Sequence, residues 1–169
     1  MAVHSAFTDE STTISEQEYE HEFNGLTSTA DEDGLFEHIL VAVDDKTNET
    51  VSGVALSLAA AYDAQVDALS VVRMNASVDH WDMVVERRED GAEAALDAVG
   101  DVAAERDVSV TKRLRYGTPA EEIEQYAEHN DVDLIVVGEP NRTGLRRFLS
   151  PKSVADRVRK STSIPVLTV

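Results

Sequence analysis

Apolar residues follow two different periods along residues 36–169. Short, nearly continuous apolar runs predict buried strands, and longer stretches in which apolar residues recur every three or four positions predict helices with one face on a core. The predicted strands are 36–45, 66–72, 108–116, 132–138 and 164–169. The predicted helices are 47–62, 80–106, 119–129 and 151–161.

Strands and helices therefore alternate through this whole region, which is typical of an α/β fold: a five-stranded parallel sheet with helices on both faces. Crossovers between parallel strands are right-handed, so few topologies remain. Ligands of such sheets bind outside the carboxyl ends of the strands. The positions of interest at those ends are Asp44–Asp45, 71–73, Gly117 and Gly138.

Residues 1–34 lack both periods. They contain nine acidic residues and no Lys or Arg, and hence half of the formal charge of −18. A segment so polar and so charged cannot bury enough apolar surface to offset the entropy that folding costs. We therefore expect a disordered acidic N-terminal extension over 1–34 and one domain over 35–169.

The composition excludes several classes of function. With 33 acidic residues against 15 Lys and Arg, the chain does not bind nucleic acid through its overall charge. The acidic excess and the small number of Lys, which is 4, favour a protein adapted to high salt. The absence of cysteine excludes disulfides and thiolate metal sites. No apolar run has the length of a membrane span or the character of a signal peptide, so we expect a cytoplasmic protein.

Asp44 is the first candidate for a ligand contact. Its carboxylate follows the first predicted strand and is suited to accept hydrogen bonds from the ribose hydroxyls or the adenine amine of a nucleotide. A strand-to-helix loop also favours Asp for capping. The sequence leaves both interpretations open.

The loop over 139–150 is the longest of the domain, and long loops are often functional. It ends with Ser150 and Pro151 at a predicted helix start, where free backbone N–H groups suit an anion and where Ser150 is equally suited to cap the helix. Three arginines of the same loop are suited either to bind phosphate or to pair with nearby acids: Arg142, Arg146 and Arg147.

No catalytic arrangement stands out in the sequence. The five histidines are scattered, at 4, 21, 38, 80 and 129, and have no metal-ligand spacing. A phosphate-binding P-loop would need glycine at position 151, where Pro151 stands. These features favour a binding protein over an enzyme.

Four stretches of the domain resemble the universal stress protein family (the UspA domain). The opening strand, ILVAVDD, ends at Asp45. The turn GTPAEEI begins at Gly117. The strand DLIVVG is followed by RTGL, which begins at Arg142. The last stretch combines SVA, from Ser153, with IPVLTV, from Ile164.

The resemblance implies a fold and an assembly. The fold is similar to that of the adenine nucleotide alpha hydrolases, with a five-stranded parallel sheet in the order 3-2-1-4-5. The assembly is a homodimer formed by pairing of the last strands, which would cover an otherwise exposed apolar edge. The residues at that edge are Pro165, Val166, Leu167 and Val169.

One branch of the family binds ATP, here expected with Mg²⁺, through the pattern G-x2-G-x9-G-[ST] after the fourth strand. Gly138 matches the first glycine, Asn141 replaces the second, and either Pro151 or Lys152 stands at the third. Ser153 matches the final position only if one residue is inserted. The positions that correspond to a nucleotide site are Asp44, Val71, Gly138, Asn141, Arg142, Lys152, Ser153 and Val154.

Three functions are consistent with these observations. The first is a stress-linked binding or regulatory module with a degenerate nucleotide-binding loop. The second is an ATP-binding universal stress protein with slow or no hydrolysis, in which Asn141, Lys152 and Ser153 hold the triphosphate. The third is a structural interaction protein that is recruited through its acidic segment, 1–34.

Overall fold

The computed structural model describes residues 35–47, 49–74, 81–139 and 153–169, without the side chains of Trp81 and Asp82. The extension expected over 1–34 lies outside these ranges. So do seven residues of the predicted loop and helix start: Asn141, Arg142, Arg146, Arg147, Ser150, Pro151 and Lys152.

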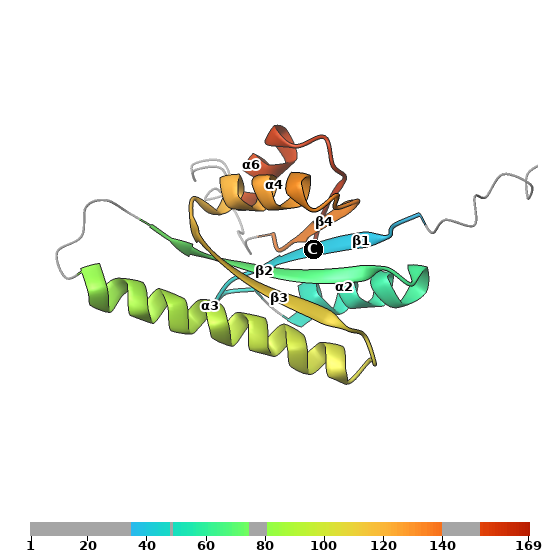
Figure 1. Ribbon diagram of the computed structural model, residues 1–169, viewed down its shortest axis with the longest axis horizontal. Helices are drawn as coiled ribbons and strands as arrows, with labels where there is room; N and C mark the ends of the chain where they lie inside the picture. Colours follow the sequence, from blue (N-terminus) through green and yellow to red (C-terminus); the bar gives the residue numbers. More distant parts are fainter. Residues whose placement is uncertain (1–34, 48, 75–80, 140–152) are drawn as a thin grey trace, which may run out of the picture. The chain divides into compact units, whose positions relative to one another are not determined.

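Five parallel strands form one sheet in the order β3-β2-β1-β4-β5, which confirms the predicted fold class (Figure 1). The strands are β1 (His38–Val43), β2 (Gln65–Arg73), β3 (Val110–Gly117), β4 (Leu134–Val137) and β5 (Val166–Thr168). The helices are α2 (Glu49–Tyr62), α3 (Trp81–Ala104), α4 (Pro119–His129) and α6 (Val154–Ser161). No helix in the described ranges is long and apolar enough to cross a membrane.

Helices cover both faces of the sheet, as the sequence predicts (Figure 1). On one face, α2 and α3 pack against side chains that include Ile39 and Val41. On the other face, α4 and α6 pack against side chains that include Leu40 and Ile135. Because successive residues of a strand point to opposite faces, β1 and β4 are apolar along nearly their whole length.

The buried faces of the helices and the bounds of the strands agree with the sequence in some places and differ in others. Apolar residues of α3 at helical spacing predict one buried stripe, and these residues are buried: Ala92, Leu96, Val99 and Ala103. In α2 the spacing of Val51, Ala55 and Leu58 predicts that Leu58 is inside, but it is only half-buried and Leu56 is buried instead. β5 is shorter than the predicted 164–169 and begins after Pro165, a residue that has no N–H to donate to a neighbouring strand.

Aspartates take left-handed backbone conformations at three turns from a helix to a strand. Asp63, Asp107 and Asp131 have φ values of 55°, 55° and 51°. They follow the ends of α2, α3 and α4, where glycine is the more usual residue. The short polar side chain of Asp tolerates this conformation. Part of the acidic excess of the chain therefore lies in its turns.

Gly117 is the described glycine whose backbone requires that residue type. Its φ is 149°, and a Cβ there would lie 2.6 Å from Oε1 of Glu122. β3 ends at Gly117, Thr118 is the N-cap, and α4 begins at Pro119, whose fixed φ suits the first helical position. The Gly-Thr-Pro stretch is thus a tight turn from a strand into a helix.

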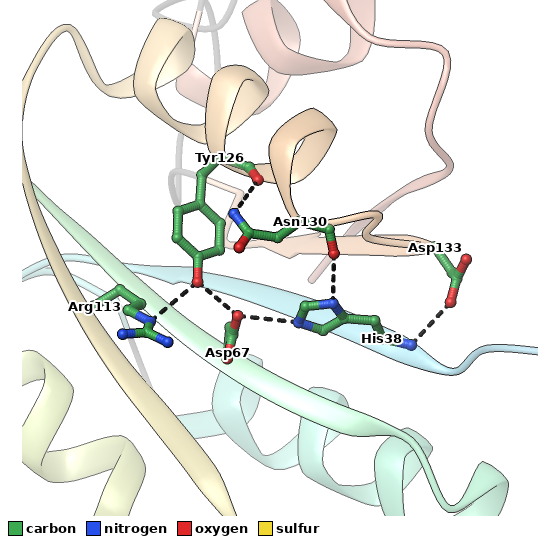
Figure 2. A network of polar contacts seen from close by, with 6 residues as sticks. All are labelled: His38, Asp67, Arg113, Tyr126, Asn130 and Asp133. Carbon is green, nitrogen blue, oxygen red and sulfur yellow. Dashed lines mark hydrogen bonds and ion pairs between the residues drawn. The ribbon is translucent and has the colours of Figure 1, made fainter.

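A carboxylate is buried within the sheet. Asp67 of β2 is only 7% exposed and lies between the buried apolar residues Val66 and Ala68. Its Oδ2 accepts a hydrogen bond of 2.6 Å from the Tyr126 hydroxyl of α4 and lies 3.0 Å from Nε2 of His38 in β1 (Figure 2). An unpaired buried carboxylate would be strongly destabilising, so these two partners are what allow Asp67 at this position.

His38 extends this network to the end of α4 (Figure 2). Its Nδ1 lies 2.8 Å from the backbone carbonyl of Asn130, the C-cap residue of α4, and donates to it because a carbonyl oxygen can only accept. Its backbone N–H donates to the Asp133 carboxylate at 2.8 Å. His38 therefore connects β1, β2 and α4. Sequence reasoning placed this residue in a strand but assigned it no partner.

The environment of Tyr126 favours its neutral form. Burial raises the pKa of Tyr126 above 10.0, and the hydrogen bond to Asp67 raises it further, because ionisation would place two negative charges side by side. Arg113, whose Nε donates to the same hydroxyl at 3.2 Å, lowers this pKa by a smaller amount.

A pH above about 10 should therefore destabilise the fold through Tyr126. Its pKa is higher in the folded state, so the stabilisation is fully present below the unfolded pKa and is lost as the pH rises through the folded pKa. Urea unfolding between about pH 8 and 11 should give a free energy of unfolding that falls less steeply for Tyr126→Phe than for the wild type. Tyr62→Phe changes an exposed tyrosine outside the Asp67 network and should stay closer to the wild-type slope. Identical slopes for Tyr126→Phe and the wild type would contradict this assignment.

Candidate functional site

The carboxyl ends of β1 and β4 form the point at which the strand order reverses. These two strands are neighbours, with Ala42 opposite Val137, but β2 lies on the far side of β1 and β5 on the far side of β4. Asp44 and Gly138 follow the two strands directly. A crevice outside this point is where parallel sheets of this kind bind ligands. The structure thus brings two of the predicted site residues to the expected place.

Within the described residues, nothing around Gly138 requires a glycine. Its backbone φ is not in the left-handed region, and a Cβ there would make ordinary contacts, 3.4 Å from Cγ2 of Val51 and 3.9 Å from Cγ2 of Thr47. The residue is half-buried beside the β1–α2 turn. The absence of a side chain at Gly138 therefore leaves space beside the turn that an alanine would partly fill.

Asp44 serves the turn that follows β1. Its Oδ1 accepts hydrogen bonds from the Thr47 hydroxyl at 2.8 Å and the Lys46 N–H at 3.1 Å, and its own N–H donates to the Thr47 hydroxyl at 2.9 Å. The capping interpretation of Asp44 is therefore the one that these contacts support. Its Oδ2 is the atom that remains available, since it accepts no hydrogen bond within the described residues.

The helix expected over 151–161 begins later, at Val154, and the prediction of its start was wrong. Ser153 is the N-cap: its hydroxyl accepts from the Asp156 N–H at 3.1 Å and donates to Oδ2 of Asp156 at 2.9 Å. The Ser153 N–H also donates to that oxygen, at 3.2 Å, which completes a capping box. The spacing of Ser153 and Asp156 was a signal for this box in the sequence, where Pro151 suggested an earlier start.

The capping box decides what Ser153 can offer a ligand. Its hydroxyl and then its backbone N–H hold the pKa of Asp156 below its usual value of 3.8, so the carboxylate stays charged. The hydroxyl hydrogen already points to that carboxylate. A phosphate at Ser153 would have to displace this hydrogen bond and would lie next to the negative charge of Asp156.

Val71 and Val154 occupy the other side of the sheet from the β1–α2 turn. Both are half-buried and pack against the hydrophobic cluster beneath α4 and α6. They lie at the end of β2 and the start of α6, so the structure places both at the edge of this cluster. Asn141, Arg142 and Lys152 complete the predicted set but lie outside the described residues.

Two cavities within the described ranges are lined in part by α2. One of about 40 Å³ is lined by Asp44, Thr47 and Ser52 among others, which is room for water but not for a nucleotide. A larger hollow of about 560 Å³ lies along α2, with Gly53 and Arg106 on its rim, away from Gly138. The described residues contain no group of three His, Cys, Asp or Glu that could hold a metal ion.

β5 forms one edge of the sheet. Val166, Leu167 and Val169 are half-buried, with Val166 on the α4–α6 face and the other two on the α2–α3 face. Pro165 is exposed, and its carbonyl accepts from the Ile135 N–H at 3.0 Å. One side of β5 pairs with β4, and its outer side has no partner in the part of the chain that the structure describes.

Replacement of Ser153 by Ala should lower the free energy of unfolding by about 1 kcal/mol, since the N-terminus of α6 loses its cap. Ser153→Thr retains a hydroxyl and should remain closer to the wild type. Ser161→Ala, in the last turn of the same helix, is the control, because Ser161 makes one long hydrogen bond of 3.3 Å. Thermal unfolding followed by circular dichroism measures the three variants. A wild-type melting temperature for Ser153→Ala would show that the box contributes nothing.

Comparisons with known proteins agree with the strand order. A universal stress protein of Methanocaldococcus jannaschii is 34% identical over 144 residues, which cover 81% of this chain and 84% of that protein. A protein of the same family from Burkholderia pseudomallei is 26% identical, with a TM-score of 0.62, and the match covers 80% of this chain and 96% of that one. The universal stress protein from Archaeoglobus fulgidus in complex with dAMP is 21% identical, with a TM-score of 0.62 and coverage of 79% and 98%. Residues 35–169 match the model of the universal stress protein family, and the chain belongs to that family.

Proposed function

We propose that this protein is a stress-linked binding module that takes an adenine nucleotide between the carboxyl ends of β1 and β4. The observation that carries the proposal is Gly138. It lies where the strand order reverses, and neither its backbone nor its packing against the described residues requires a glycine. A glycine that the fold does not need allows a ligand to approach the backbone closely.

The relatives support adenine nucleotides as the ligand class. The Archaeoglobus fulgidus protein was solved in complex with dAMP, and another universal stress protein of the same fold, 20% identical, in complex with cAMP. Both ligands contain adenine and a single phosphate. At these identities the likeness is one of fold, so the residues of this chain must provide the contacts.

Each described residue of the proposed site has a distinct role. The free Oδ2 of Asp44 accepts a hydrogen bond from a ribose hydroxyl or from the adenine amine. The half-buried side chain of Val71 offers apolar contact to the adenine ring. The backbone at Gly138 lies beside the phosphates. Arg142 and Lys152 would add positive charge there, and Asn141 would take the place of the second glycine of the ATP-binding pattern.

The phosphate end of the site favours a short phosphate chain. Ser153 is engaged with Asp156, whose charge repels an anion at the start of α6. We therefore infer that a nucleoside monophosphate binds more readily than ATP. ATP with Mg²⁺ is the second candidate, and the positive charges of Arg142 and Lys152 are what favour it.

Gly138→Ala should reduce AMP binding by about tenfold or more and leave the melting temperature within a few degrees of the wild type, because the new methyl makes ordinary contacts with the protein. Isothermal titration calorimetry with AMP, and separately with ATP and Mg²⁺, measures the affinities. Gly100→Ala is the control: Gly100 lies in α3, away from the carboxyl ends of the strands, and its new Cβ would displace only the flexible end of the Lys112 side chain. Equal affinities of Gly138→Ala and the wild type would exclude this site, and tighter binding of ATP than of AMP would favour the second candidate.

We propose further that β5 pairs with β5 of a second copy to form a homodimer. The outer side of β5 has no partner within the described residues, and three half-buried apolar side chains lie in β5 or directly after it: Val166, Leu167 and Val169. An open apolar edge of this kind is prone to association unless it is covered. Pairing of two copies would cover it on both.

Leu167→Glu should convert the dimer to monomers, because the pairing would bring two like charges into a closed apolar contact. Sedimentation equilibrium measures the mass. Leu167 also packs on the core of its own chain, so Pro165→Glu, at an exposed position, is the second variant and should shift the equilibrium in the same direction without loss of folding. A dimer that persists in both folded variants would show that the interface is elsewhere.

A further inference from the structure

The outer edge of β3 is a basic strip on an acidic protein. β3 is the last strand of the sheet on the side opposite β5, and it pairs only with β2 within the described residues. It contains Lys112, Arg113 and Arg115 and no acidic residue, whereas the chain as a whole has a formal charge of −18. All three side chains are exposed.

One buried tyrosine holds two of these side chains. Arg113 Nε donates to the Tyr126 hydroxyl at 3.2 Å, and the Arg115 guanidinium lies over the ring, with its Cζ 5.5 Å from the centroid. Tyr126 is 4% exposed, and its bond to Asp67 fixes it in turn (Figure 2). Tyr126 therefore presents both guanidinium groups on one side of β3, about 7 Å apart along the strand.

Neither guanidinium is neutralised within the described residues. The ion pairs there join His38 to Asp67 and Lys112 to Asp97. Arg113 uses its Nε, but its terminal nitrogens have no acceptor in those ranges, and the same holds for all the N–H groups of Arg115. No described arginine forms an ion pair, and what sets Arg113 and Arg115 apart is that one buried tyrosine contacts both of them.

Charged side chains on an edge strand also prevent two sheets from pairing. In this protein acidic residues are in large excess and would serve that purpose equally well. Arginine differs from them in its planar fork of N–H donors, which matches a carboxylate. Because Tyr126 positions both guanidinium groups, binding of a carboxylate ligand is favoured over mere repulsion of a second sheet.

We propose that the outer edge of β3 binds an extended acidic segment of a partner protein, which adds a strand to the sheet. The backbone groups on the outer side of β3 pair with the segment, as in other cases of strand addition. Side chains at alternate positions of a strand point the same way, so carboxylates two residues apart meet Arg113 and Arg115. The surface is remote from Gly138 and from β5, so it does not depend on nucleotide binding or on the proposed dimer.

Fluorescence anisotropy with a labelled eight-residue peptide that alternates Glu and Thr tests this proposal. The full chain is used at the lowest salt concentration at which circular dichroism shows it folded, since salt screens charge pairs. We expect saturable binding that is weakened about tenfold or more in the double variant Arg113→Gln/Arg115→Gln. The control Arg87→Gln/Arg157→Gln removes the same charge from exposed helical positions and should change the affinity by less than about twofold.

Two further reagents separate the carboxylate contacts from the backbone pairing. A peptide with Gln in place of Glu, and a peptide that keeps Glu but is N-methylated at alternate residues, should each bind about tenfold more weakly. Tyr126→Phe keeps the ring under Arg115 but removes the hydroxyl that holds Arg113. Its affinity for the Glu peptide should therefore lie between the affinities of the wild type and the double variant.

Several results would overturn the proposal. One is an equal affinity of the wild type and Arg113→Gln/Arg115→Gln for the Glu peptide. Another is an equal affinity of the wild type for the Glu and Gln peptides. A third is binding that does not saturate at about 1 mM peptide. Competition by an oligothymidylate as strong as that by the Glu peptide would show a general anion site instead. A change of mass for the double variant in sedimentation equilibrium would show that a second copy of the chain covers this edge.

Discussion

The pairing of the Asp67 carboxylate is the interaction on which the arrangement of α4 and the central strands depends. A buried carboxylate requires partners, and α4 and β1 provide them. Tyr126 and His38 both contact Oδ2 of this carboxylate. The other ring nitrogen of His38 contacts the backbone carbonyl of Asn130, the C-cap residue of α4. The requirement is fully met, since no buried side-chain N or O within the described ranges lacks a partner.

This network lies at the amino ends of the strands, opposite the carboxyl ends that carry the candidate site. Asp67 and His38 lie near the amino ends of their strands, so the hydrogen bonds hold α4 against the sheet on that side. The carboxyl ends, with Asp44 and Gly138, are joined to the helices by turns and loops. Rigid strands that carry ligand-binding loops at one end are the usual arrangement for binding in α/β folds.

The acidic residues of the chain have structural tasks that its net charge conceals. Asp67 is a buried hydrogen-bond acceptor, Asp133 accepts from the first N–H groups of β1, and Asp156 completes the cap of α6. Asp63, Asp107 and Asp131 take turn conformations that glycine would otherwise provide. Against this background the exposed arginines of β3 are a local reversal of sign, which Tyr126 links to the same buried network.

The order and type of every described element followed from the hydrophobic pattern, because burial on one or both faces imposes a period that a sequence displays directly. The strand order came from a family resemblance, and short-range signals placed Gly117 and Pro119 correctly. Such signals compete at α6, where Pro151 suggested one start and the Ser153–Asp156 spacing another, and only the folded helix shows which prevailed. The sequence alone placed Asp67 inside the strand predicted over 66–72, where a buried carboxylate needs a partner. The tertiary structure decided that the partners are His38 and Tyr126, 29 and 59 residues away, since hydrogen bonds over such separations exist only once the strands and α4 have packed together.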